Sequence, residues 1–258
     1  MVWNPLCKRS DGYYDIDFDN LAQVCDDKCR VLLLCNPHNP GGLVWKKATL
    51  QRLADFCMER HLLVVSDEIH ADMPLFGHQH TPFASVSANA AAISITFQAP
   101  TKTFNIAGIV SAYAIVPNEN IRKVFYDWLA VNELDEPHLF APIATIAAFR
   151  EGEAWRKQMI HYVERNILFV EAFCQQHMPA IKPLRPQASF LIWLDCRALH
   201  LSHDELLHLF IDEAHLALND GEMFGPGGEG YMRLNVGCPR QLVEQALRQL
   251  CDAVQHHV

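Results

Sequence analysis

The sequence has little positive charge for its size, and it contains no basic stripe. Its 258 residues include 21 Lys and Arg against 30 Asp and Glu, which gives a net charge of −9 at pH 7. A surface that binds nucleic acid needs clustered cations to meet the phosphates, so we expect no nucleic-acid partner. Half of the residues are hydrophobic, and a chain of this length can therefore bury a sizeable core.

Long apolar runs are also absent. The longest, residues 106–116, is interrupted by Gly108, Ser111 and Tyr113, and it falls short of the roughly 20 residues that a membrane-spanning helix needs. The first residues show neither the basic nor the apolar segment of a secretory signal. We therefore expect a protein of the cytoplasm with no membrane partner.

The cysteines and histidines lack the spacing of a metal site. The nine cysteines are scattered without paired Cys-x-x-Cys motifs, and Cys25 and Cys29 come nearest to a pair. We expect mostly reduced, buried thiols, as is usual in a reducing compartment. The histidine groups lack a carboxylate or cysteine partner at ligand spacing, so we expect surface histidines and no metal. These groups are His200, His203 and His208, and His78 with His80.

Charged residues are nearly missing from one long stretch. Between Asp72 and Glu119 the only Asp, Glu, Lys or Arg is Lys102. Apolar runs around this stretch predict strands, and a stripe of apolar residues at i, i+3, i+4 and i+7 predicts a helix. The expected strands are 31–35, 62–66, 93–97 and 111–116, and the expected helix is 49–60. This alternation predicts a parallel α/β sheet, whose ligands lie beyond the carboxyl ends of the strands.

The pattern changes near residue 154. Residues 155–176 predict one long helix that can bridge two domains, and residues 190–194 and 231–235 predict strands. Ser202 and Glu205 form the spacing of a capping box at the start of a helix, and Pro239 marks the start of the last helix. We therefore expect a large domain over residues 1–153 and a small α+β domain over residues 154–258.

Polar residues stand where three of the predicted strands end. Asn39 lies in the rigid turn "NPHNPGG", Asp67 follows the second strand directly, and Lys102 follows the third. An acid or an amine at the end of an apolar strand is costly unless it has a partner, and desolvation makes an amine a better nucleophile. A lysine that holds an aldehyde and an aspartate that pairs with a pyridinium nitrogen are the residues of pyridoxal phosphate chemistry. The alternative is that Lys102 extends into solvent and Asp67 caps a helix.

Four segments together carry a family resemblance. They are "NPHNPGG", "VVSDEIHADM", "APTKTFNIAG" and "YMRLNVGCPR". In this order and at these separations they resemble the class I/II aminotransferase superfamily, the pyridoxal-phosphate-dependent transferases of fold type I. The forms "SDEIH" and "KTFNIAG" are most similar to its MalY/PatB branch, the cystathionine β-lyases. The resemblance runs from about Asn4 to the C-terminus.

The resemblance implies a role for each matching residue. Lys102 would hold the aldehyde of pyridoxal 5'-phosphate as a Schiff base, Asp67 would pair with the pyridine nitrogen, and Asn39 would bond the phenolic oxygen of the ring. His70 stands where many aminotransferases have a tyrosine that contacts the same oxygen, and Thr101 matches a phosphate-binding hydroxyl. One further position, Arg233 of "RLNVG", matches the arginine that binds the substrate α-carboxylate. From the sequence alone, an ordinary surface ion pair is the alternative for this arginine.

The sequence departs from the family pattern in two places. Aminotransferases have a phosphate-binding arginine eight residues after the lysine, where this chain has Val110, and this fits the lyase branch better. The resemblance also begins about a third of the way into the family's length. We therefore expect an incomplete large-domain sheet with unpaired edges, no phosphate cradle, and weak cofactor binding by the chain alone.

The resemblance implies carbon–sulfur β-elimination on cystathionine- or cysteine-type amino acids, with a homodimer as the assembly of full-length members. An aminotransferase with the same cofactor and a non-catalytic remnant or interaction protein are the two alternatives. The products of the reaction distinguish a lyase from an aminotransferase. Failure to bind the cofactor would indicate the non-catalytic protein.

Overall fold

The computed structural model describes residues 1–257, except for the side chain of His257. The chain forms two compact units that interleave along the sequence. Unit 1 comprises Met1–Cys25, Asn39–Leu43 and the stretch from His161 onward, and unit 2 comprises Asp26–His38 and Val44–Ile160. The domain boundary that we expect near residue 154 stays a prediction.

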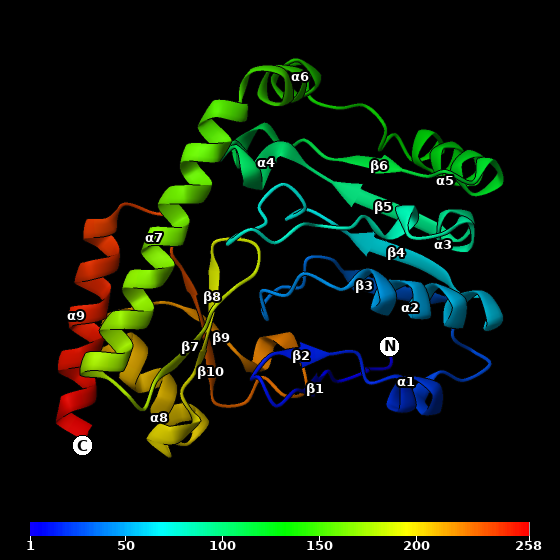
Figure 1. The fold of residues 1–258 in the computed structure, drawn as a ribbon. Helices are drawn as coiled ribbons and strands as arrows, with labels where there is room; N and C mark the ends of the chain where they lie inside the picture. The colour runs from blue at the N-terminus through cyan, green and yellow to red at the C-terminus, as the bar shows by residue number, and fades with distance from the viewer. Residues whose placement is uncertain (258) are drawn as a thin grey trace. The chain divides into compact units, whose positions relative to one another are not determined.

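Unit 2 contains the sheet that the apolar runs predict. Its strands β3 (Val31–Cys35), β4 (Leu63–Asp67), β5 (Ser94–Gln98) and β6 (Tyr113–Ile115) lie in the order β3-β4-β5-β6. The first three are parallel, with Val31 opposite Leu63 and Val64 opposite Ser94. Figure 1 shows the four strands side by side in this order.

The fourth strand runs in the other direction. β6 is antiparallel to β5, with Thr96 opposite Ile115, whereas the alternating pattern alone predicts parallel strands throughout. Between β5 and β6 the chain forms only the short helix α4 (Pro100–Thr103) and a 3₁₀ turn at Ala107–Ile109. A parallel neighbour requires a crossover of a dozen or more residues, usually a helix, and this connection instead returns directly. The sheet is therefore mostly parallel, as expected, with one antiparallel edge.

Four further helices complete unit 2: α2 (Lys47–Glu59), α3 (Ala88–Ala92), α5 (Glu119–Val131) and α6 (Ala141–Glu151). The apolar stripe predicted for residues 49–60 is confirmed in α2, which buries Leu50, Leu53, Ala54 and Cys57. In contrast, α5 buries none of its residues. Val31 and Leu33 of the edge strand β3 are also exposed, by 49% and 68%.

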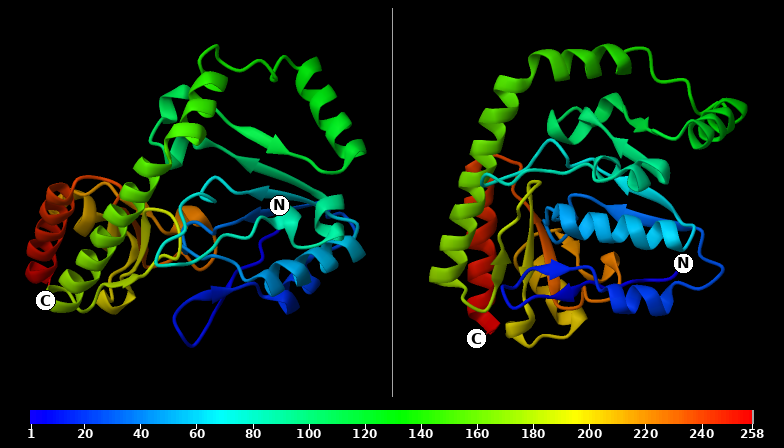
Figure 2. Two further views of the ribbon diagram at one scale, coloured as in Figure 1. Left: turned by 45° about the horizontal axis from the view of Figure 1, so that its top comes forward. Right: turned by 45° about the vertical axis from the view of Figure 1, so that its right-hand side comes forward.

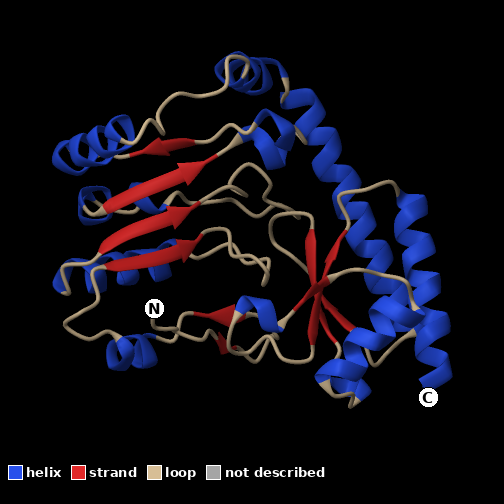
Figure 3. Cartoon of the chain, turned by 180° about the vertical axis from the view of Figure 1, so that it is seen from behind, coloured by secondary structure: helices blue, strands red, loops and turns tan. Residues whose placement is uncertain are grey.

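Helix α7 (Glu153–His177) passes from unit 2 into unit 1 at residue 161, and it is continuous in both views of Figure 2. The predicted long helix is therefore confirmed, with ends within two residues of those expected. Its second half buries Val163, Ile167, Val170 and Cys174. That half lies beside α9 (Arg240–His257) in every view (Figures 1 to 3), and Arg240 donates to Asn166 across 2.9 Å.

Unit 1 is built on an antiparallel sheet in the order β7-β8-β10-β9. The strands are β7 (Lys182–Leu184), β8 (Leu191–Asp195), β9 (Asn219–Asp220) and β10 (Tyr231–Asn235). A separate hairpin joins β1 (Cys7–Lys8) to β2 (Tyr14–Asp15), and helix α1 (Phe18–Val24) follows it. Figure 3 shows the strands of this sheet in red.

The predicted capping box is confirmed at the start of α8 (His203–His208). Ser202 accepts the backbone N–H of Glu205, and the Glu205 carboxylate accepts the backbone N–H of Ser202. The helix continues from α8 as a π-helical turn, Leu209–Glu213. This capping explains why the helix begins where the sequence predicts.

Candidate active site

Asp67 and Lys102 follow neighbouring strands at one edge of the sheet in unit 2. Asp67 is the last residue of β4, where it pairs in register with Phe97 of the parallel strand β5. Lys102 lies in α4, directly after the same end of β5. Since parallel strands place their carboxyl ends at one edge, the topology brings the acid and the amine to the same side of the sheet.

Both side chains are exposed to solvent, so the burial that the sequence suggests for them is wrong. The backbone turns as soon as β4 ends, and Asp67 Oδ1 accepts the N–H of Ile69 at 3.1 Å. The side-chain amine of Lys102 has no hydrogen bond or ion pair with any residue that the structure describes. The chain thus presents an exposed carboxylate and an unpaired amine at this edge of the sheet.

The two other expected residues of unit 2 lie close to these in the chain. His70 follows β4 and is buried, with 4% of its surface exposed, and its backbone carbonyl accepts the N–H of Met73. Thr101 lies beside Lys102 in the first turn of α4 and is half-buried. A threonine hydroxyl in this position can donate to a bound anion.

A fully buried carboxylate supports the loop that leaves β4. Glu68 accepts hydrogen bonds from the hydroxyl of Ser66 at 2.9 Å and from the backbone N–H of Phe83 at 2.8 Å. Nδ2 of Asn36 lies 3.3 Å from the same oxygen, Oε1, and Nε2 of His80 lies 2.8 Å from the other, Oε2. This network joins the ends of β3 and β4 to residues 80–83. The side chain of His80 is only 8% exposed and lies against this buried carboxylate, so it is not the solvated surface histidine that its sequence spacing predicts.

The two expected residues of unit 1 contact one another. Nη1 of Arg233, in β10, donates to Oδ1 of Asn39 at 2.8 Å. Nη2 donates to Oδ1 of Asn219 in the neighbouring strand β9. The guanidinium also lies over the ring of Phe224, with 4.7 Å between Cζ and the ring centroid. Arg233 is therefore fixed by two neutral amides and an aromatic face.

No carboxylate pairs with Arg233 among residues 1–257, so the alternative of a surface ion pair is wrong. Its Nε is buried without a hydrogen-bond partner in the same part of the chain. Burial lowers the pKa of Arg233 below its ordinary value, but an arginine remains charged in proteins. A partly buried cation without a counter-ion favours binding of an anion such as a carboxylate.

Sequence analysis missed Asn219 and Phe224, which hold Arg233. Asn219 lies in a strand of only two residues, too short to show a periodicity of its own. Phe224 ends a 3₁₀ turn, and Gly225 follows it with φ of 97°, in the region that favours glycine. The glycine-rich turn before β10 is the one signal that could have directed attention to this loop.

Comparison with known proteins decides the family. A model of the aminotransferases of class I and II matches residues 7–250. The chain belongs to this family. It is 43% identical over 98% of its length to a protein named cystathionine beta-lyase PatB, from Bacillus subtilis, of which it covers 66%. It is 32% identical over 97% of its length to Protein MalY of Escherichia coli, of which it covers 64%.

Solved structures agree with this assignment. Cystalysin from Treponema denticola, described as containing a pyridoxal 5'-phosphate cofactor, is 34% identical, with a TM-score of 0.95 over 99% of this chain and 65% of its own. A pyridoxal-phosphate-bound C–S lyase from Staphylococcus hominis is 30% identical, with a TM-score of 0.89 over 98% of this chain and 66% of its own. The resemblance and the predicted fold are therefore confirmed. The chain spans about two thirds of the length of these relatives.

The described residues include neither a metal-binding cluster of three side chains nor a helix suited to span a membrane. Among residues 1–257, no three His, Cys, Asp or Glu side chains are arranged to hold a metal ion. Within the same residues, no helix is long and apolar enough to cross a membrane. All nine cysteines are free thiols.

Proposed function

We propose that the protein is a pyridoxal-phosphate-dependent carbon–sulfur β-lyase, which converts cystathionine- or cysteine-type amino acids to a thiol, pyruvate and ammonia. The observation that carries this proposal is the acid and the amine at one sheet edge: Asp67 ends β4, and Lys102 follows the parallel strand β5. The relatives named cystathionine beta-lyase and C–S lyase support the choice of reaction.

The residues present fit the cofactor. The unpaired amine of Lys102 can condense with an aldehyde, and the exposed carboxylate of Asp67 can accept a hydrogen bond from a protonated pyridine nitrogen. We assign the phenolic oxygen to Asn39 and His70, and the phosphate to Thr101. When bound, pyridoxal phosphate supplies an electron sink for the charge that develops at the substrate Cα.

The chain's own groups then bind the substrate and move its protons. Arg233 offers a planar, charged fork to the α-carboxylate, which orients the amino acid. Nζ of Lys102 takes the proton from Cα, and the electron pair left at Cα forms the Cα–Cβ double bond while the Cβ–S bond breaks and the sulfur leaves as a thiolate. The carboxylate of Asp67 would favour a proton on the pyridine nitrogen.

Lys102→Ala tests the assignment directly. The variant is expected to lose pyruvate production from L-cystathionine by at least about 10²–10⁴-fold, the usual contribution of a general base. Lys47→Ala changes an exposed lysine of α2 and is the matched control. Pyruvate release by Lys102→Ala at the parent rate would remove this lysine from the mechanism.

An aminotransferase is the second candidate, because the matching family model describes that class. Val110 favours the lyase, since aminotransferases carry an arginine at this position. Its backbone is left-handed, with φ of 50°, and its side chain is 81% exposed. The products decide: pyruvate and thiol without an added 2-oxo acid indicate a lyase, and dependence on a 2-oxo acid indicates a transaminase.

A non-catalytic protein of the same fold is the third candidate. Borohydride reduction in the presence of the cofactor would leave no adduct on Lys102 in that case, and neither product would form. The visible spectrum recorded with added cofactor measures how tightly the chain binds it.

We further propose a cytoplasmic homodimer acting on small amino-acid substrates, with residues 1–153 and 154–258 as its two domains. The exposed apolar side chains of α5 support an assembly of more than one chain. Sedimentation equilibrium of the purified protein tests the dimer.

A further inference from the structure

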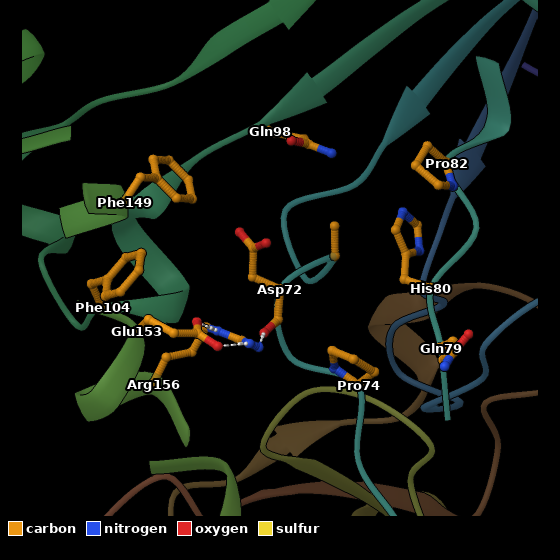
Figure 4. Close-up of a pocket in the computed structure, with 11 residues that line it drawn as sticks. Asp72, Pro74, Gln79, His80, Pro82, Gln98, Phe104, Phe149, Glu153 and Arg156 are labelled. Carbon is orange, nitrogen blue, oxygen red and sulfur yellow. Dashed lines mark hydrogen bonds and ion pairs between the residues drawn. The ribbon is translucent and has the colours of Figure 1, made fainter. Parts of the chain in front are cut away.

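Unit 2 contains a pocket to which no part of the proposed reaction is assigned. Its volume is about 530 Å³, and Figure 4 shows the side chains around it. The lining comes from the loop after β4, the end of β5, the residue after α4, and helices α6 and α7. The polar lining residues are Asp72, Gln79, His80, Gln98, Glu153 and Arg156. None of the residues that we assign to cofactor or substrate lines it.

The positive charge in this pocket is already neutralised. Arg156 donates from Nε and Nη2 to the two oxygens of Glu153, at 2.7 and 2.9 Å. Its Nη1 donates to the backbone carbonyl of Asp72 at 2.8 Å. Figure 4 shows these bonds at the base of the pocket. Because a bidentate pair of this kind cancels the charge of both partners, it leaves the pocket without a free cation.

The carboxylate of Asp72 has no such partner. Its oxygens make no hydrogen bond or ion pair with residues 1–257, although the side chain is only partly exposed. In Figure 4 the carboxylate extends into the pocket from the loop. Loss of solvent raises the pKa of Asp72, while the more distant charges of Arg156 and His80 oppose this rise. A carboxylate held this way gains more from a cation than one that is fully solvated.

His80 contributes no excess positive charge. Its Nε2 lies 2.8 Å from the fully buried carboxylate of Glu68, so the two groups together carry a charge of zero or −1. The oxygen of Gln98 accepts from the hydroxyl of Tyr113 at 2.9 Å and adds a dipole without a charge. The pocket as a whole therefore carries net negative charge, centred on Asp72.

Two aromatic rings form the apolar wall. Phe104 follows α4 and Phe149 lies in α6, and their ring centroids are 5.5 Å apart with an angle of 88° between the ring planes. Figure 4 places both rings on the same side of Asp72. Aromatic faces attract cations electrostatically, and Pro74 and Pro82 add rigid apolar surface.

We propose that this pocket binds a small organic ammonium ion, with Asp72 as its counter-ion and the rings of Phe104 and Phe149 against its apolar part. The negative charge without a partner selects a cation, and the aromatic and proline walls select one with an organic body. The proposal does not depend on the β-lyase function, since it uses a different set of residues.

Benzyltrimethylammonium is the probe that separates this site from the proposed cofactor site. A quaternary ammonium ion has no N–H and cannot condense with an aldehyde, so Lys102 cannot capture it through a bound cofactor. Titration calorimetry on the purified chain is expected to give a Kd on the order of a millimolar, as the ligand efficiency of a molecule of this size allows.

Asp72→Asn keeps the shape of the side chain and removes its charge. We expect it to weaken binding at least about tenfold, while Asp135→Asn, at an exposed aspartate of the same unit, leaves Kd unchanged. Phe149→Ala, which removes a partly exposed ring, is expected to weaken binding about threefold or more. Lys102→Ala is expected to bind the probe as the parent does. Thermal unfolding of each variant by circular dichroism shows whether it is folded.

Three results would overturn the proposal. They are the absence of binding at concentrations of tens of millimolar, equal affinity in the parent and Asp72→Asn, and loss of binding in Lys102→Ala. If Asp72→Asn does not fold, Phe149→Ala decides, and parent-like affinity in that variant counts against the site.

Discussion

Arg233 donates to Asn39 across 2.8 Å, although 194 positions separate the two residues in the chain. The bond uses the amide oxygen of Asn39, so a neutral group orients the guanidinium without cancelling its charge. Asn219 does the same from the other side. Under the proposed function, this arrangement keeps the full positive charge of Arg233 for the carboxylate of the substrate.

The first prediction concerns the shape of this cation. Arg233→Lys retains the charge but loses the planar fork, and it can no longer bond Asn39, Asn219 and a carboxylate together. We expect kcat/KM for L-cystathionine to fall about 10- to 100-fold, the value of one or two charged hydrogen bonds. Arg248→Lys, at an exposed position of α9, serves as the control. Equal kcat/KM in both variants would assign the carboxylate to another residue.

The second prediction concerns the neutral partners. Asn219→Asp places a carboxylate against Nη2 of Arg233 and neutralises the cation before substrate arrives. We expect KM to rise about tenfold or more, because the substrate then competes with a fixed anion. Asn219→Ser removes the amide without adding charge, and its KM should change less than that of Asn219→Asp. A larger effect in the serine variant would show that only the hydrogen bond matters.

The third prediction concerns the buried Glu68. In Glu68→Gln an NH₂ group, which donates hydrogen bonds, replaces one of the two accepting oxygens. At least one buried N–H or O–H therefore loses its partner. Each such loss costs about 1–3 kcal/mol, and we expect the free energy of unfolding to fall by about 2–4 kcal/mol. Urea denaturation measures it.

Glu59→Gln provides the comparison for this experiment. Glu59 is the last residue of α2 and is exposed, so its change should stay within about 0.5 kcal/mol of the parent. If Glu68→Gln were as stable as Glu59→Gln, the network around β3 and β4 would contribute nothing to stability.

The strands that place the proposed catalytic residues could be predicted because their signal is local. The predicted strand 62–66 is apolar up to Ser66 and is followed directly by Asp67, and these are the properties of a buried parallel strand. In the structure, β4 and β5 each begin and end one residue later than predicted. Asp67 and Lys102 follow from these strand ends, and so does the sheet edge that they share.

The orientation of β6 and the surroundings of Arg233 could not be predicted in this way. The direction of a strand depends on how its connection packs, and β6 follows a connection without a crossover helix. Asn219 and Phe224 reach Arg233 only through the register of β9 against β10 and the turn between them. Such contacts belong to the tertiary structure, and no periodicity in the sequence indicates them.

The solvent exposure of individual side chains was predicted least well from the sequence. An uncharged stretch around Lys102 suggests burial, yet the side chain is exposed because α4 turns the chain away directly after β5. The reverse holds for His80, whose neighbours His78 and Gln79 are exposed while its own side chain is 8% exposed against Glu68.

The last prediction concerns the dependence of stability on pH. His38 lies in the "NPHNPGG" turn, where its ring contacts that of Trp45 edge-on with 5.7 Å between centroids. Burial lowers the pKa of His38 from 6.5 to about 4. The unfolded chain therefore binds more protons than the folded chain between these values, and stability falls as the pH drops from above 6.5 toward 4.

A variant that does not titrate at this position isolates the effect from that of the carboxylates, which also take up protons in acid. Between pH 7 and pH 4.5, the free energy of unfolding of the parent should fall by about 2 kcal/mol more than that of His38→Gln, since one pKa unit corresponds to about 1.4 kcal/mol. His177→Gln, at an exposed histidine of α7, should follow the parent. Parallel pH profiles for the parent and His38→Gln would mean that the pKa of His38 is the same in the folded and the unfolded chain. Burial in the turn would then not lower this pKa.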